Sequence, residues 1–169
     1  MSDEIVNRVA QSKLVTIDLE DFYQEGERFP LDVSEWLEEG FLLREKDFRA
    51  KAAEFDWSRY TGSYVALYCA TDAIIPAWAY MLLATFLSPY AKKVVVGDLE
   101  LLETVLYQEQ VEKLDVSVYK DLPVIVKGCS NKPVPKNAYL FLTQKLQPVA
   151  KNIMYGEACS SVPLYKKKK

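Results

Sequence analysis

Histidine is absent from the 169-residue chain, and its absence excludes the chemistry that depends on imidazole. Ser-His-Asp and Cys-His catalysis, the two-histidine metalloprotease site and the 2-His-1-carboxylate iron site all need it. Glycine is scarce, and none of the six glycines belongs to a GxGxxG dinucleotide loop or a Walker A loop. Any chemistry therefore depends on cysteine, carboxylate, lysine or tyrosine side chains, or on a bound cofactor.

The chain also lacks a long apolar segment and a recognisable leader. The first residues, Met1 to Glu4, include two acids, and no apolar stretch of the kind found in signal peptides follows them. The longest apolar stretch, 73–87, is too short to span a bilayer. We therefore expect a cytoplasmic protein with no membrane partner.

Acidic residues outnumber basic ones, which bears on the partners of the chain. The formal net charge is −3. Four lysines form a basic tail at 166–169, so the rest of the chain is more acidic still. An acidic surface repels phosphate backbones, and we expect no nucleic-acid partner. The tail itself is typical of a solvated chain end.

One strand–loop–helix–strand pattern occurs twice in the sequence. Residues 76–98 align with 135–157 without a gap, and nine pairs are identical. The prolines that bound each helix recur at the same spacing, and both copies end in a glycine followed by an acid. Chance likeness between amphipathic helices explains shared leucines but not shared prolines. The pattern predicts two duplicated βαβ units, at 64–98 and 124–157.

Strands that alternate with helices through short loops predict an α/β fold with a mostly parallel sheet flanked by helices. We expect a single domain, 1–169, in which an N-terminal α/β extension over 1–62 precedes the two repeats. The predicted strands of the sheet are 64–68, 94–96, 124–126 and 153–155, with 14–19 at one edge, and the predicted helices include 4–11, 44–55, 77–87 and 99–114.

Three cysteines follow predicted strands, at the place where ligands of parallel sheets bind. Cys69 and Cys129 come after the first strand of each repeat and are expected to superpose, and Cys159 lies four residues beyond the last strand. If the strands share one sheet, three thiols meet at one edge, with Asp72 and Asp98 as additional ligands. Thiolates suit zinc, iron or an iron–sulfur cluster. The sequence therefore predicts a metal or cluster site, since three thiolates with a carboxylate or water complete a tetrahedron.

Two other interpretations of the cysteines stay open. In the first, the chain is a non-enzymatic interaction or scaffold protein whose cysteines only pack, as small hydrophobic residues do. In the second, it is a thiol-dependent redox protein, which needs a cysteine of lowered pKa beside a helix N-terminus or a lysine. The sequence leaves open whether the chain is an enzyme.

Several further residues have structural explanations. Trp78 and Tyr80 have helical spacing and are assigned to the core. Asp72 also fits a role in ordering the loop before the helix. The charged run 45–49 is typical of a solvated helix face, and the apolar stripe beside it offers a surface for contacts between copies in a homo-oligomer.

The chain resembles an uncharacterised bacterial family that is classed as a domain of unknown function. The segments that carry the resemblance are Leu43-Arg-Glu-Lys-Asp-Phe-Arg49, Asp72-Ala-Ile-Ile-Pro-Ala-Trp-Ala-Tyr80 and Gly156-Glu-Ala-Cys-Ser-Ser-Val-Pro163. The similarity covers the whole chain and implies no activity, fold or catalytic residue. It does imply an association with iron–sulfur assembly proteins as partners, in keeping with a three-thiol site.

Overall fold

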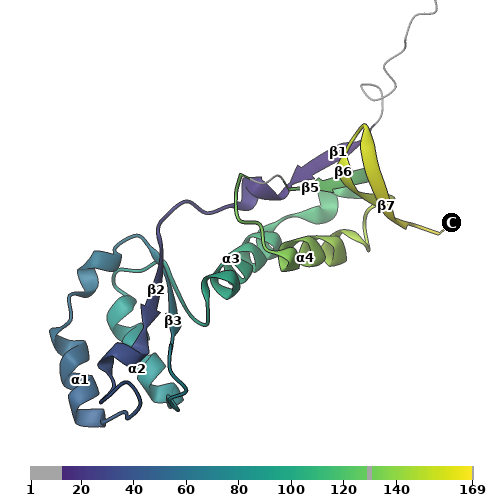
Figure 1. The fold of residues 1–169 in the computed structure, drawn as a ribbon. Helices are drawn as coiled ribbons and strands as arrows, with labels where there is room; N and C mark the ends of the chain where they lie inside the picture. The colour runs from purple at the N-terminus through teal and green to yellow at the C-terminus, as the bar shows by residue number, and fades with distance from the viewer. Residues whose placement is uncertain (1–12, 129–130, 169) are drawn as a thin grey trace, which may run out of the picture. The chain divides into compact units, whose positions relative to one another are not determined.

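The computed structural model describes residues 13–128 and 131–168 (Figure 1). Within them the chain divides into two compact units. The three-stranded unit comprises Gln24–Glu103, and the four-stranded unit comprises the described residues among 1–23 and 104–169. The helix that we expected at 4–11 lies outside the described residues.

Strands and helices alternate along the described part of the chain, which confirms the predicted α/β fold with mostly parallel strands. In chain order the elements are β1 (Val15–Asp18), β2 (Arg28–Asp32), α1 (Glu45–Glu54), β3 (Tyr64–Tyr68), α2 (Ala77–Leu87), β4 (Lys93–Val96), α3 (Leu99–Lys113), β5 (Pro123–Lys127), α4 (Lys136–Leu146), β6 (Asn152–Glu157) and β7 (Ser160–Lys166). Short 3-10 turns, each begun by an aspartate whose carboxylate accepts a backbone N–H, follow β1 and β2 and precede β3 and β5.

The strands form two sheets rather than the single sheet that we expected. In the three-stranded unit β2, β3 and β4 are parallel, with β3 in the middle. In the four-stranded unit β1, β5 and β6 are parallel, and β7 pairs with β6 in the antiparallel direction. The expectation of one sheet was wrong because alternation of strands and helices gives the direction of each strand but does not say which strands pair.

Two strands, β2 and β7, were not expected, and both contain a proline. Pro30 of β2 lies opposite Ala66 of β3. Proline is tolerated there because β2 is an edge strand of its sheet. Pro163 of β7 lies opposite Met154, where the register of the β6–β7 pair shifts. Edge positions and irregular pairing thus admit a proline in both strands.

The basic tail starts inside a sheet. Lys166 is the last residue of β7. The backbone N–H of Lys167 donates to the carbonyl oxygen of Lys151 at 2.9 Å, and its ammonium lies 2.9 Å from the Asp121 carboxylate. The solvated tail predicted at 166–169 therefore begins with two residues that belong to the fold, and Lys169 lies outside the described residues.

The core of the three-stranded unit lies between its sheet and the helices α1 and α2. Val65 and Leu67 of β3 share a buried cluster with residues of both helices. Trp36 belongs to this cluster and makes edge-to-face contacts with Phe48 and Trp57, at centroid distances of 5.8 and 5.2 Å. Such aromatic pairs stabilise a core beyond the area that they bury.

The four-stranded unit repeats this plan with α4 on its sheet. Residues of α4 pack with Val124 and Val126 of β5 in a second buried cluster. Both α2 and α4 have 11 residues and follow a proline of almost the same conformation, with φ and ψ of −68° and 147° at Pro76 and −69° and 148° at Pro135. Each unit thus contains a parallel β–α–β segment. The origin of the two segments by duplication stays a prediction.

A buried ion pair fixes the first turns of α3 within the three-stranded unit. The Nε of Arg28 donates to Glu103 Oε1 at 2.6 Å, and the two side chains are 11% and 10% exposed. The same guanidinium donates to the carbonyl oxygen of Gly26 and lies 4.9 Å from the centre of the Tyr64 ring. The charge of Glu103 is therefore balanced at close range in a site that little water reaches.

We expect Glu103→Gln to lower the free energy of unfolding by about 3 kcal/mol, because it leaves the Arg28 charge buried without its partner. The matched control is Glu45→Gln, which removes a 2.9 Å pair with Arg49 whose side chains are 63% and 52% exposed. The control should cost about 0.5 kcal/mol. Urea unfolding measures both, and equal losses in the two variants would contradict a special role for the buried pair.

Candidate functional site

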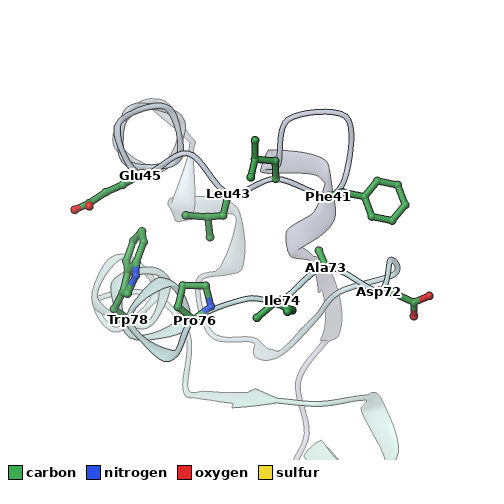
Figure 2. Close-up of a pocket in the computed structure, with 9 residues that line it drawn as sticks. Phe41, Leu43, Glu45, Asp72, Ala73, Ile74, Pro76 and Trp78 are labelled. Atoms are coloured by element: carbon green, nitrogen blue, oxygen red, sulfur yellow. The ribbon is translucent and has the colours of Figure 1, made fainter.

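An open groove lies between two segments of the three-stranded unit (Figure 2). One wall is 41–45, which leads into α1, and the other is 72–78, which leads into α2. The groove has a volume of about 500 Å³. Its lining residues are Phe41, Leu42, Leu43, Glu45, Asp72, Ala73, Ile74, Pro76 and Trp78. All but the two carboxylates are apolar, so the groove is suited to apolar contact.

The apolar side chains at the rim of the groove are open to solvent. Ile74 is 92% exposed, Phe41 62% and Leu42 52%. Figure 2 shows Leu43 of one wall directed toward Pro76 of the other, with Ile74 beside them. Single exposed apolar residues are ordinary, but a group of them around one depression is typical of a contact site.

Two sets of hydrogen bonds hold the second wall in place. Asp32, the last residue of β2, accepts the N–H groups of Ser34 at 2.9 Å and Ala70 at 3.0 Å. The hydroxyl of Thr71 donates to the carbonyl oxygen of Gly40 at 2.6 Å, which joins the two walls directly. Gly40 has a φ of +78°, a conformation that glycine adopts without strain. The groove is therefore formed before any ligand arrives.

The two carboxylates of the groove lie at its opposite ends and do not face a common point. Figure 2 shows Glu45 and Asp72 at opposite ends, with their side chains directed away from each other. Glu45 accepts from Arg49 at 2.9 Å, and that guanidinium lies 5.3 Å from the centre of the Trp78 ring. General acid–base work on one substrate needs two groups that face a common point. These two carboxylates do not face a common point. They place negative charge at the two ends of an apolar groove.

Negative charge dominates the surroundings of the groove. Residues 35–49 and 69–78 contain six carboxylates and three cations. Two of the cations, Arg44 and Arg49, already form ion pairs with Glu38 and Glu45. The surface beside the apolar lining therefore attracts positive charge and repels negative charge.

The carboxylate of Asp32 is held in its ionised form. Partial burial by itself raises the pKa of Asp32, but the hydrogen bonds from Ser34 and Ala70 outweigh it and bring the pKa below its usual value. A carboxyl group whose pKa is lower in the folded than in the unfolded chain stabilises the fold above the unfolded pKa. That stabilisation is lost as the pH falls through the folded pKa.

We expect Asp32→Asn to lower the free energy of unfolding by about 1 kcal/mol near pH 6, because a charged hydrogen-bond acceptor is replaced by a neutral one. The difference from the native chain should shrink as the pH falls below the usual aspartate pKa of about 4, because Asp32 itself becomes protonated. Urea unfolding at several pH values measures it, with the exposed Asp47→Asn as control. A difference that stays constant down to the lowest pH would contradict this role of Asp32.

The three cysteines do not follow strands of a common sheet, so the argument that brought them together was wrong. Cys69 follows β3, whereas Cys159 lies in the two-residue turn between β6 and β7 of the other sheet. Cys129 lies outside the described residues. The 59-residue spacing of the repeat also sets Cys69 against Gly128, one position before the expected partner. The three-thiol site stays a prediction without its shared sheet edge.

The described thiols have different surroundings. Cys69 is partly buried against the core of the three-stranded unit, with its sulfur 3.4 Å from the Thr71 hydroxyl oxygen. Burial and the neighbouring Cys69 raise the pKa of Tyr80 above its usual value. Cys159 is exposed. Among residues 13–128 and 131–168, no group of three or more cysteine and carboxylate side chains is arranged to hold a metal ion.

The two expected carboxylate ligands have other roles in the structure. Asp98 accepts the N–H of Leu101 at 2.8 Å and so caps the start of α3. Asp72 lines the groove at the exposed end of the loop after β3. The sequence reasoning thus named one groove residue, but for a different purpose.

The apolar residues at the rim of the groove were not predicted from the sequence. Trp78, which was assigned to the core, does pack against it and also lines the groove. A signal for them was present, since residues 73–91 contain no charged side chain although the stretch includes a loop and a turn. Residues 41–43 add three apolar side chains directly after a glycine. Uncharged residues in segments that leave the core are a sign of contact surface.

The fold and the site define an α/β protein of two compact units with a preformed apolar groove on one of them. The chain belongs to the family described as Protein of unknown function (DUF2480), whose family model matches residues 3–167. This match confirms the family resemblance but gives no support to the iron–sulfur association. No curated protein and no solved structure matches the chain. In the described part of the chain, no helix is both long and apolar enough to cross a membrane.

Proposed function

We propose that this chain is a non-enzymatic interaction protein whose groove, between 41–45 and 72–78, receives an apolar segment of a partner protein. One observation carries the proposal: Ile74 is 92% exposed in the wall of the groove. The loop that presents it is fixed by the hydrogen bonds of Ala70 and Thr71. An isoleucine held in solvent by an ordered loop gains nothing for folding, whereas a partner would bury it.

The chemistry of the groove agrees with this use. Burial of a large aliphatic or aromatic side chain stabilises a complex by about 1.5 kcal/mol or more, before the cost of association is subtracted. Three such residues, Phe41, Leu42 and Ile74, are available in one place. A preformed groove also avoids the cost of ordering its own loops when the partner arrives. The interaction reading of the cysteines, in which they only pack, is supported at Cys69 by its contacts with the core.

The three-thiol metal or cluster site and a thiol-dependent reaction are the rival proposals. The metal site needs Cys69, Cys129 and Cys159 together, whereas the thiol-dependent reaction needs one of them with a lowered pKa. Metal analysis of the full chain, purified without air or chelator, discriminates the metal site from the interaction protein. Equimolar zinc or iron that is lost in Cys69→Ser would favour the metal site.

We also propose a cytoplasmic location, which the free thiols of two cysteines support, because such thiols persist in a reducing compartment.

A neutral environment-sensitive dye, Nile red, tests whether the groove takes an apolar ligand. We expect the native chain to raise and blue-shift the dye emission, and Phe41→Ser with Ile74→Ser to lower the signal about fivefold or more, because the apolar rim is removed. Val118→Ser, which changes a residue 63% exposed in the four-stranded unit, is the control. Circular dichroism checks that each variant folds.

Equal dye signals from the native chain and the folded double serine variant would contradict the proposal. A loss of the same size in the Val118→Ser control would also contradict it, because the dye would then report scattered surface contacts rather than the groove.

A further inference from the structure

The helix α2 carries no charged residue, unlike its counterpart α4. Under the 59-residue spacing, the two helices have the same length and the same place between two parallel strands. Their buried residues also correspond: Ala79, Leu83 and Leu87 of α2 align with Ala138, Leu142 and Leu146 of α4. The two helices therefore differ chiefly on the faces that do not enter the cores.

The outward face of α2 carries small side chains at two positions where α4 is polar. Ala77 and Thr85 stand where α4 has Lys136 and Gln144, both exposed. Between them Met81 is 68% exposed, and its counterpart in α4, Leu140, is 54% exposed. Because α4 shows that this place in the fold accepts charged and polar side chains, the fold does not demand the uncharged face of α2. The face is better explained by what binds to it.

This face continues into the groove. Residues 77, 81, 85 and 88 are spaced by four, four and three, so they lie on one side of the helix. Trp78, in the first turn of the same helix, lines the groove (Figure 2). The groove and the outward face of α2 therefore form one surface, which we call the α2 surface: residues 41–45 and 72–78 with Met81, Thr85 and Ser88.

Charge decides which partner fits the α2 surface. Glu45 and Asp72 lie at the two ends of the groove, and the segments 35–49 and 69–78 around its walls carry six carboxylates and three cations, so the border is negative. A second copy of the chain would bring the same negative border against it, and anionic lipid or nucleic acid would be repelled in the same way. A protein segment with positive side chains beside an apolar stripe is complementary to both the apolar lining and the negative border.

We infer that the partner segment is an amphipathic helix with an apolar face bordered by lysine or arginine, which packs along α2 with one end in the groove. This inference rests on the proposed function and names the class of partner. The 11 residues of α2 give a helix about 16 Å long, so three to four turns of a partner cover it. The small side chains of Ala77, Thr85 and Ser88 around Met81 allow two helices to approach closely.

Two synthetic peptides test the inference on the full chain. Both are amphipathic helices of about 14 residues with a leucine face, bordered by lysine in one and by glutamate in the other. We expect the Leu/Lys peptide to bind about tenfold more tightly than the Leu/Glu peptide at about 50 mM salt, and the difference to shrink at about 500 mM. Calorimetry measures both affinities. Ile74→Ser with Met81→Ser should abolish binding of the Leu/Lys peptide, whereas Leu140→Ser, at the position of α4 that corresponds to Met81, should leave it unchanged.

Other outcomes overturn the inference in distinguishable ways. Equal affinity for the two peptides, or binding of neither while Nile red still binds, overturns the partner class but leaves the proposed function standing. Binding of the Leu/Lys peptide that survives Ile74→Ser with Met81→Ser shows charge attraction away from the α2 surface and overturns the inference. So does sedimentation of the chain with phosphatidylserine vesicles, or a dimer in analytical ultracentrifugation that the same double variant dissociates. Failure of both peptides and of the dye overturns the proposed function as well.

Discussion

A carboxylate that receives the backbone of a distant loop is the contact on which the groove depends. In the three-stranded unit Asp32 ends β2 and accepts the N–H of Ala70, just after β3. In the four-stranded unit Glu20, in the turn after β1, accepts the N–H of Asn131 at 2.9 Å. Each carboxylate thus joins the exit of one strand to the loop that leaves its neighbour. In a parallel sheet these loops have no ladder of their own, so a side chain must supply the hydrogen bonds that hold them.

In both units a carboxylate holds the loop by accepting a backbone N–H, but the side chains that the loop and the following helix expose differ. After Ala70 the loop carries Ile74 into solvent and begins a helix without charge. The corresponding helix α4 begins with a lysine and exposes polar side chains beside Leu140, which is 54% exposed. The packing of both cores depends on the inward residues, so the outward residues of the two helices are free to differ. The apolar α2 surface is therefore a property added to the fold and not a requirement of it.

The sequence predicted the parts of the fold that depend on neighbours in the chain. The bounds 77–87 of α2 were predicted correctly, because Pro76 starts the helix and Pro89 follows its end. Strand pairing depends on distant segments, so the single sheet was wrong and the edge strand with Pro30 was missed. The three-thiol argument failed for the same reason, since it placed loops side by side by assuming one sheet. The groove also depends on a hydrogen bond between residues distant in sequence, from the Thr71 hydroxyl to the Gly40 carbonyl oxygen, and no local sequence pattern predicts it.

We propose that the α2 surface, made of two loops and an uncharged helix, binds a basic amphipathic segment. Amide chemical shifts of the isotope-labelled full chain, recorded during titration with the Leu/Lys peptide, test it most directly. We expect the shifts to change at 41–45, at 72–78 and along the outward positions of α2, while the amides of α4 stay in place. Changes centred on α4, or spread evenly over the acidic residues of both units, would contradict binding at the α2 surface.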